Sequence, residues 1–184
     1  ESPQPQGPGE ALLVSLVRFL QPHIVVEVGT LYAQTTVCLA AALPPGGIVY
    51  TLELRPTDSM WEVIRFWGLE DRIKVVVGNS VQTIQTLPDG IGLAYVDGDH
   101  LYPSIKADGD LLWPKMAPGG IMAFDDLTGT SPAVRRGPAF YVSERFSGAL
   151  VLPAHRGLAL VQKPLQRLHM DDGSEREWPL RTLP

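Results

Sequence analysis

The sequence predicts an α/β fold: a seven-stranded, mainly parallel sheet with helices on both faces and a C-terminal antiparallel strand pair. Three observations predict it. Short apolar, β-branched runs alternate with helix-length segments five times along the chain. The 18 glycines and 17 prolines fall mostly between these segments, where turns are needed. Two more short apolar runs follow near the C-terminus, and alternation of this kind is typical of parallel sheets whose strands are joined by helices.

The order of elements follows from the apolar runs and their breakers. The run 24–28 is bounded by Pro22 and Gly29, which predicts a short strand buried on both faces. The expected strands are 24–28, 48–54, 72–77, 92–97 and 121–124, then 150–153 and 158–162 as a hairpin. The expected helices are 10–20, 33–43, 57–67, 81–87, 103–116 and one beginning at Ser131–Pro132. We therefore expect a flexible lead-in over 1–9, one domain over 10–162 and a loop-like tail over 163–184.

Composition excludes several classes of protein. The formal net charge of −5 argues against nucleic acid as a partner. Cys38 is the only cysteine, so the chain has no internal disulfide and no cysteine zinc cluster. No apolar run reaches the roughly 18 residues of a membrane helix, and residues 1–9 lack the basic region of a secretory signal. We therefore expect a cytoplasmic protein with no membrane partner.

Acidic side chains stand at the ends of four of the five expected parallel strands. Ligands in such sheets bind outside the carboxyl ends of the strands, so these residues should gather at one edge. The segments at the strand ends are Glu27 to Ala33, Glu53 to Arg55, Gly78 to Ser80, Asp97 to Tyr102, and Asp125–Asp126. The sequence therefore predicts a ligand site that is rich in carboxylates.

The first two strand ends favour a cationic nucleoside cofactor. Glu53 lies 53 − 29 = 24 residues after Gly29, close to the spacing at which an acidic residue accepts hydrogen bonds from ribose hydroxyls. The loop lacks the G-x-G-x-x-G pattern, and Glu27 would repel a pyrophosphate. These features favour S-adenosylmethionine (SAM), which carries a sulfonium, over a nicotinamide dinucleotide.

Four segments carry a family resemblance over about residues 10–162. The run from Glu27 to Thr36 resembles motif I of class I SAM-dependent methyltransferases, which have a Rossmann-like fold. The segments 96–102, 113–120 and 124–126 are similar to those of small bacterial O-methyltransferases related to the macrocin and cephalosporin-pathway enzymes, and more distantly to catechol-type O-methyltransferases. Ala33 departs from the pattern, because the family usually has a second glycine there.

The resemblance implies a role for each matching residue. The implied cofactor-binding residues are Glu27, Gly29, Thr30, Ala33, Glu53, Asn79, Ser80 and Asp97. Asp97, Asp125 and Asp126 match the positions that bind a divalent metal in metal-dependent members. His100, together with Asp97, matches the site of methyl transfer, where it could act as a base.

The chemistry of methyl transfer leaves two routes open. A hydroxyl nucleophile needs positioning and loss of its proton, and a carboxylate-held cation can supply both. An oxygen-only donor set suits Mg²⁺ rather than zinc. His100 is the alternative base, because histidine titrates near physiological pH.

Structural interpretations compete with these roles. Asp99 is better explained as a cap of the helix that follows it, and Asn79–Ser80 could equally cap a helix. Gly29 could be a plain turn residue, and Asp97, Asp125 and Asp126 could be solvated strand ends or caps.

The sequence as a whole predicts a SAM-dependent O-methyltransferase that acts on a hydroxyl of a small molecule with the help of Mg²⁺. The alternative is a SAM-binding protein of the same fold that has an accessory role or performs other SAM chemistry, such as aminopropyl transfer. The sequence leaves the acceptor open. It is compatible with a homodimer formed through the first helix or the tail.

Overall fold

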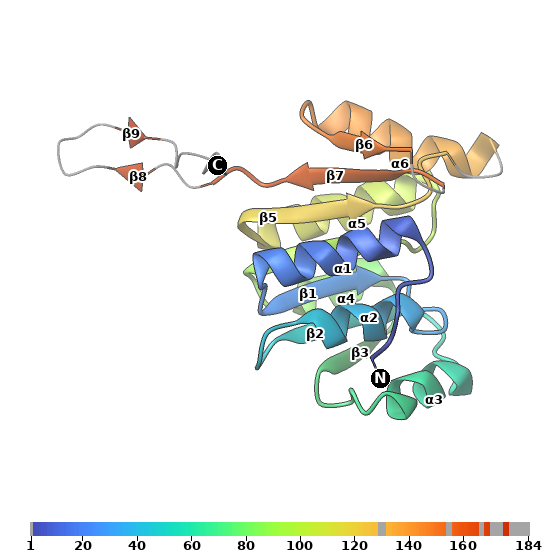
Figure 1. The fold of residues 1–184 in the computed structure, drawn as a ribbon. Helices are drawn as coiled ribbons and strands as arrows, with labels where there is room; N and C mark the ends of the chain where they lie inside the picture. Colours follow the sequence, from blue (N-terminus) through green and yellow to red (C-terminus); the bar gives the residue numbers. More distant parts are fainter. Residues whose placement is uncertain (1, 129–131, 154–155, 166–167, 170–174, 177–184) are drawn as a thin grey trace.

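A computed structural model describes residues 2–128, 132–153, 156–165, 168–169 and 175–176, without the side chains of 132–136, 168–169 and 175–176. Seven strands form one sheet in the order β3-β2-β1-β4-β5-β7-β6 (Figure 1). The parallel strands are β1 (Ile24–Val28), β2 (Ile48–Glu53), β3 (Ile73–Val77), β4 (Ile91–Val96) and β5 (Met116–Phe124). The antiparallel pair is β7 (Leu158–Gln162), which joins β5, and β6 (Leu150–Leu152) at the edge. The predicted fold class is confirmed.

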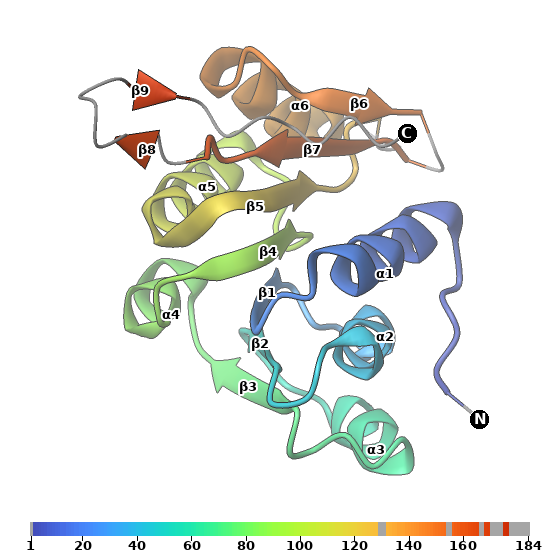
Figure 2. The same ribbon diagram turned by 60° about the vertical axis from the view of Figure 1, so that its left-hand side comes forward.

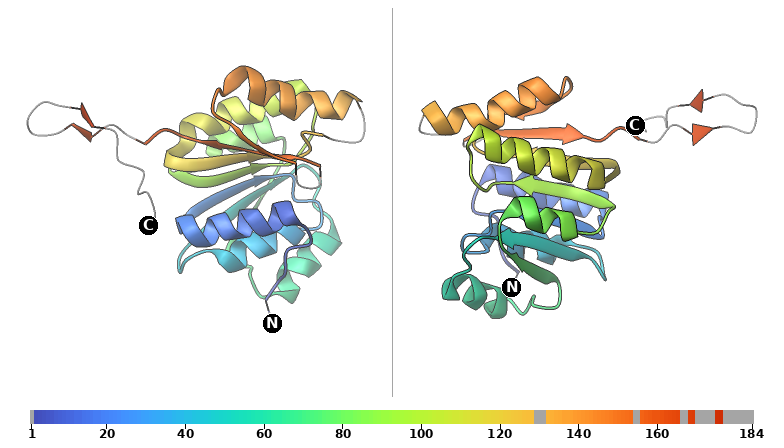
Figure 3. Two further views of the ribbon diagram at one scale, coloured as in Figure 1. Left: turned by 45° about the horizontal axis from the view of Figure 1, so that its top comes forward. Right: turned by 180° about the vertical axis from the view of Figure 1, so that it is seen from behind.

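Within the described residues, six helices cover the two faces of the sheet. Figure 2 shows α1 (Pro8–Leu20), α2 (Gln34–Ala42) and α3 (Asp58–Phe66) on one face, and α4 (Ser80–Thr86), α5 (Tyr102–Lys115) and α6 (Pro132–Arg145) on the other. The two faces appear in turn in the two views of Figure 3. Each face has its own apolar core, because strand side chains alternate between the faces.

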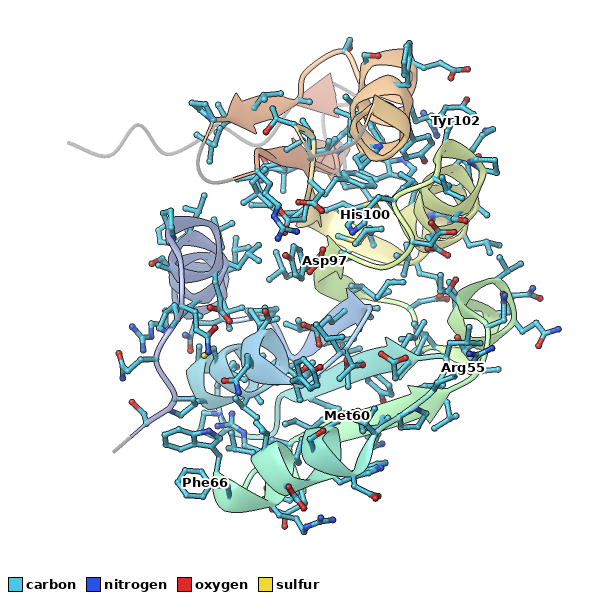
Figure 4. The ribbon with its side chains drawn as sticks, turned by 90° about the vertical axis from the view of Figure 1, so that its right-hand side faces the viewer. Arg55, Met60, Phe66, Asp97, His100 and Tyr102 are labelled. Carbon is cyan, nitrogen blue, oxygen red and sulfur yellow. The ribbon has the colours of Figure 1, made fainter. Side chains whose placement is uncertain are left out.

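Helix α3 illustrates how sequence pattern selects a buried face. Met60 and Ile64 lie four residues apart and are fully buried against the sheet, whereas Phe66 is 79% exposed at the end of the helix (Figure 4). The Thr57 hydroxyl caps the helix by accepting a hydrogen bond from the Met60 backbone N–H at 3.2 Å. Within the part of the chain that the structure describes, no helix combines the length and the apolar character needed to cross a membrane.

Two expectations about the elements need correction. The predicted strand 121–124 is part of a longer strand that begins at Met116, although Gly119 and Gly120 favour a turn. The segment is extended because Gly119 and Gly120 exchange backbone hydrogen bonds with Lys163. In the tail, where only loop is predicted, β8 (Leu168–His169) pairs with β9 (Glu175–Arg176), away from the main sheet (Figures 1 and 3). Ser131 lies outside the described residues, and α6 is described from Pro132.

Candidate active site

The carboxyl ends of the central strands are tied together one residue beyond the sheet. The backbone N–H of Gly29 donates to Leu52 at 3.0 Å, and that of Asp97 donates to Val28 at 2.9 Å. The N–H of Asp125 donates in the same way to Val96 at 3.2 Å. These hydrogen bonds fix the backbone positions from which the segments after β1, β4 and β5 start. Figure 4, which looks onto the strand ends, shows Asp97 at the end of β4.

A pocket of about 690 Å³ opens at this edge. It is lined mainly by the segments that follow β1, β2, β3 and β4. The predicted residues among its lining are Glu27, Gly29, Thr30, Glu53, Asn79, Ser80, Asp97 and His100. Ala33, Asp125 and Asp126 are outside the lining. The strand-end rule thus brings eight of the predicted residues to one cavity.

Gly29 permits the close packing of the β1 and β4 ends. Its φ is +94°, a region that favours glycine. A Cβ at this position would overlap the carbonyl oxygen of Asp97 and lie 2.9 Å from its carbonyl carbon. The interpretation of Gly29 as a plain turn glycine is therefore incomplete, because this residue also sets the spacing between two segments that line the pocket.

Ala33 has a conformational role at the N-terminus of α2. It is fully buried, and its φ of +60° and ψ of +21° are left-handed. Glycine adopts this conformation without steric cost, which explains the glycine usual at the matching position of the family. Ala33 shapes the loop after β1 and does not line the pocket.

Glu53 holds the loop after β1 through its carboxylate. Oε2 accepts hydrogen bonds from the backbone N–H groups of Thr30 at 3.2 Å and Leu31 at 3.1 Å. Oε1 accepts one from the Arg55 N–H at 2.9 Å. The carboxylate lies at the end of β2 on the pocket wall, which is the place predicted for a ribose-binding group.

Glu27 lies beneath the pocket in a buried hydroxyl network. It is 1% exposed, and its Oε2 accepts hydrogen bonds from Thr36 at 2.5 Å and Thr51 at 2.7 Å. The Thr51 hydroxyl also lies 2.6 Å from that of Thr30. Burial raises the pKa of Glu27 to about 7, against the opposing effect of the two threonine hydrogen bonds.

We expect Glu27→Gln to change how stability depends on pH. The folded chain holds the Glu27 proton up to about pH 7, whereas the unfolded chain releases it near the ordinary value of 4.5. This group's contribution to stability is therefore present below about pH 4.5 and is lost as the pH rises through 7. Glutamine does not titrate, so between pH 5 and 8 the variant should gain about 2 kcal/mol relative to the wild type.

Urea unfolding at the two pH values measures this difference. The exposed Glu62→Gln is the control and should follow the wild type. A Glu27→Gln variant that tracked the wild type at both pH values would contradict the expectation.

Asp97 and Asp125 share one tyrosine. The Tyr95 hydroxyl lies 3.1 Å from Oδ2 of Asp97 and 2.8 Å from Oδ2 of Asp125. A phenol has one hydrogen and can donate it to one carboxylate at a time. Burial, and next the charge of Asp125, raise the pKa of Asp97 to about 8. The pair thus concentrates negative charge that a cation or a proton would relieve.

Asp126 and His100 form the other half of the acidic cluster. His100 Nε2 is 3.4 Å from Oδ2 of Asp126 and 3.8 Å from Oδ1 of Asp97, and Figure 4 shows Asp97 and His100 side by side. Arg156, at the end of the β6–β7 connection, reaches the same Asp126 oxygen at 3.3 Å. The other oxygen of Asp126, Oδ1, is buried and has no hydrogen-bond partner among the described residues.

The donor set fits a hard divalent cation by chemistry. Asp97, Asp125 and Asp126 offer only oxygens, and Asp126 Oδ1 is an unpaired buried acceptor. Across the described ranges, no three His, Cys, Asp or Glu side chains are placed so that they could hold a metal together as they stand. Joint binding by all three aspartates would therefore require their side chains to converge.

Of the two predicted helix caps, Asn79 is one and Asp99 is not, because Asp99 lies two residues before Leu101, the N-cap of α5, which has no side-chain cap hydrogen bond. Oδ1 of Asp99 accepts a hydrogen bond from the Leu101 N–H at 3.1 Å, and its Oδ2 accepts one from the Ser104 hydroxyl at 2.7 Å. Asn79 caps α4 by accepting from the Val81 N–H at 3.0 Å. Asn79 and Ser80 also line the pocket, so capping and ligand contact are compatible there.

Two charged residues of the pocket were missed by the sequence reasoning. Asp108 lies inside α5, far from any strand end, and Arg156 lies in what the sequence indicates is only a hairpin turn. A signal existed for Asp108, because it is an acidic residue between apolar positions of a helix. Arg156 reaches Asp126 only because β7 runs antiparallel to β5.

Residues 26–127 match the family model described as "Methyltransferase domain", which covers more than half of the 184 residues. The chain therefore belongs to this methyltransferase family, and its recognition as a class I SAM-dependent methyltransferase is confirmed.

Curated relatives match over part of their length. The chain is 34% identical over 104 residues to catechol O-methyltransferase B of Danio rerio, covering 52% of this chain and 39% of that protein. It is 38% identical over 92 residues to a catechol O-methyltransferase of Mycobacterium tuberculosis, covering 47% and 41%. The matched segments thus span about two fifths of these relatives.

Solved structures resemble most of the chain. The O-methyltransferase TomG of Streptomyces achromogenes, in complex with SAM, superposes with a TM-score of 0.74 at 20% identity, covering 88% of this chain and 82% of that one. An O-methyltransferase of Bacillus cereus, in complex with SAH (S-adenosylhomocysteine), has a TM-score of 0.72 at 22% identity, covering 89% and 84%. These likenesses confirm the Rossmann-like fold.

Proposed function

We propose that this protein is a SAM-dependent O-methyltransferase that transfers a methyl group to a hydroxyl of a small molecule. One observation carries the proposal: a single pocket joins the predicted cofactor loop at Gly29–Thr30, the carboxylate of Glu53, and the pair Asp97 and His100. A nucleoside sulfonium and a nearby hydroxyl are the reactants that such a lining can bring together. Family membership and the O-methyltransferase names of the relatives support it.

In this proposal each group of residues contacts a different part of the cofactor. Glu53 accepts hydrogen bonds from the ribose hydroxyls, and Gly29 and Thr30 border the methionine part. Asn79 and Ser80 border the adenine. The acidic lining favours the positive sulfonium and its ammonium group over a dinucleotide with a pyrophosphate.

Transfer moves one methyl group and one proton. The acceptor oxygen attacks the methyl carbon, the carbon–sulfur bond breaks, and its electron pair stays on sulfur as S-adenosylhomocysteine forms. The hydroxyl proton must leave the acceptor, and His100 lies where it could take it, with Asp97 and Asp126 positioned to stabilise the resulting imidazolium. A bound Mg²⁺, held by Asp97, Asp125 and Asp126, would lower the pKa of the hydroxyl and orient it.

Calorimetric titration with SAM and S-adenosylhomocysteine tests the cofactor. Incubation with hydroxylated small molecules, followed by detection of S-adenosylhomocysteine, tests the transfer. Absence of binding at high micromolar cofactor would contradict the proposal. Binding without turnover across acceptors would favour the accessory alternative, and a different product from SAM would reveal other SAM chemistry.

Chelation tests the metal separately. We expect EDTA to reduce methyl transfer at least tenfold and added Mg²⁺ to restore it, with cofactor binding unchanged. Activity that is indifferent to EDTA would assign proton removal to His100 without a metal. A cytoplasmic location and a small-molecule partner belong to the same proposal.

A further inference from the structure

Asp108 is a buried carboxylate of the pocket that the proposed function leaves without a role. It lies on α5, lines the pocket, and is 2% exposed. Its Oδ1 is buried and finds no hydrogen-bond partner in the described part of the chain. Leaving a buried acceptor unpaired costs stability, so such a group at a pocket wall points to a ligand that donates to it.

The other carboxylates that line the pocket contrast with Asp108. Glu27 accepts from two threonines, Glu53 from three backbone N–H groups, and Asp99 from Leu101 and Ser104. Asp97 shares the Tyr95 hydroxyl with Asp125. Burial raises the pKa of Asp108 to about 6, and the nearby Ser80 side chain opposes that rise. At neutral pH it is therefore an ionised acceptor with one free oxygen.

The position of Asp108 indicates which part of the cofactor lies within its reach. Ser80 lines the same pocket and begins α4, which packs against α5. It follows β3, the strand beyond β2 and Glu53 at the edge of the sheet. With the ribose at Glu53 and the sulfonium toward Asp97, the base is the part of the nucleoside that extends toward Ser80. Neutral adenine carries hydrogen-bond donors only on its 6-amino group, and a carboxylate is an acceptor only.

We propose that Asp108 accepts a hydrogen bond from the 6-amino group of the cofactor's adenine and so selects adenine over other bases. This inference rests on the proposed function, because it takes the ligand to be SAM. It gives the unpaired Oδ1 of Asp108 a hydrogen-bond donor, the 6-amino group. In this proposal Ser80 borders the base and also holds the Asp108 carboxylate in place.

The test compares S-adenosylhomocysteine with its analogue in which hydrogen replaces the 6-amino group. Calorimetry on the wild-type protein should show the analogue binding at least about tenfold more weakly, because a charged acceptor loses its donor. Equal affinity of the two ligands would overturn the role of Asp108 alone. Failure of both ligands to bind would overturn this inference together with the proposed function.

Variants complete a double-mutant cycle. In Asp108→Ala the two ligands should bind within about threefold of each other. Asp108→Asn keeps an amide acceptor and a similar shape, so it should retain part of the preference even if the alanine variant folds poorly. Asp110→Asn is the matched control on the same helix, where the carboxylate pairs with Lys106, and it should keep the full wild-type preference. A tenfold preference that persisted in Asp108→Ala would overturn the assignment.

Discussion

Replacing Gly29 with alanine is expected to abolish SAM binding and to lower the free energy of unfolding by about 3 kcal/mol or more. Two costs add at this position. The backbone conformation, with φ at +94°, disfavours any side chain, and the new Cβ would overlap the Asp97 carbonyl oxygen. The ends of β1 and β4 would have to separate, which distorts the pocket wall on both sides.

Gly46→Ala is the matched control for this prediction. Its φ is +79°, but a Cβ there meets nothing within 4 Å. The free energy of unfolding of this variant should fall only by the conformational cost, about 1 kcal/mol, and its cofactor affinity should be unchanged. Urea unfolding and calorimetry measure both quantities. Similar losses in the two variants would show that the contact between Gly29 and Asp97 carries no weight.

Asp125→Ala is expected to reduce methyl transfer by at least about a hundredfold while the affinity for S-adenosylhomocysteine stays within threefold. The position of Asp125 explains why the rate of methyl transfer should fall while the affinity for S-adenosylhomocysteine is kept. Asp125 is not among the residues that line the pocket, and it is linked to Asp97 through the Tyr95 hydroxyl, so its loss should affect the acidic cluster and leave the cofactor surface intact.

Comparison with His100→Gln separates the two routes of proton removal. If the metal activates the hydroxyl, the histidine variant should lose less than about tenfold. If His100 is the base, it should lose about a hundredfold or more, and Asp125→Ala should be mild. Asp89→Ala removes an exposed carboxylate remote from the pocket and should behave as wild type. Full activity in Asp125→Ala would exclude its proposed role in metal binding.

Local patterns in the sequence could predict most of the fold. The strand Ile24–Val28 matches the expected range because Pro22 and Gly29 bound one apolar run. The start of β5 at Met116 could not be predicted, because Gly119 and Gly120 favour a turn and only pairing with distant Lys163 keeps them extended. Tertiary pairing overrides local preference in such segments.

The same distinction between local pattern and tertiary packing applies to the residues of the site. Residues that directly follow strands, such as Glu53 and Asp97, could be predicted because topology brings all strand ends to one edge. The sequence around Asp108 indicates only an acidic residue among apolar helix positions, and its place at the pocket depends on how α5 packs. Arg156 could not be predicted, since its approach depends on the antiparallel return of β7. Ala33 also follows a strand, but it is buried at the N-terminus of α2, outside the pocket lining, and its cofactor contact stays a prediction.

The pairing of β1 with β4 has a consequence for the order in which the chain folds. Val28 pairs with Val96, 96 − 28 = 68 residues apart, whereas Ile24 pairs with Ile48, 48 − 24 = 24 residues apart. Closing the longer loop costs more entropy, so we expect this central pairing to form after β1 has joined β2. The Gly29–Asp97 contact spans the same late pairing. In a refolding experiment the gain of cofactor affinity should therefore lag behind the gain of helical signal.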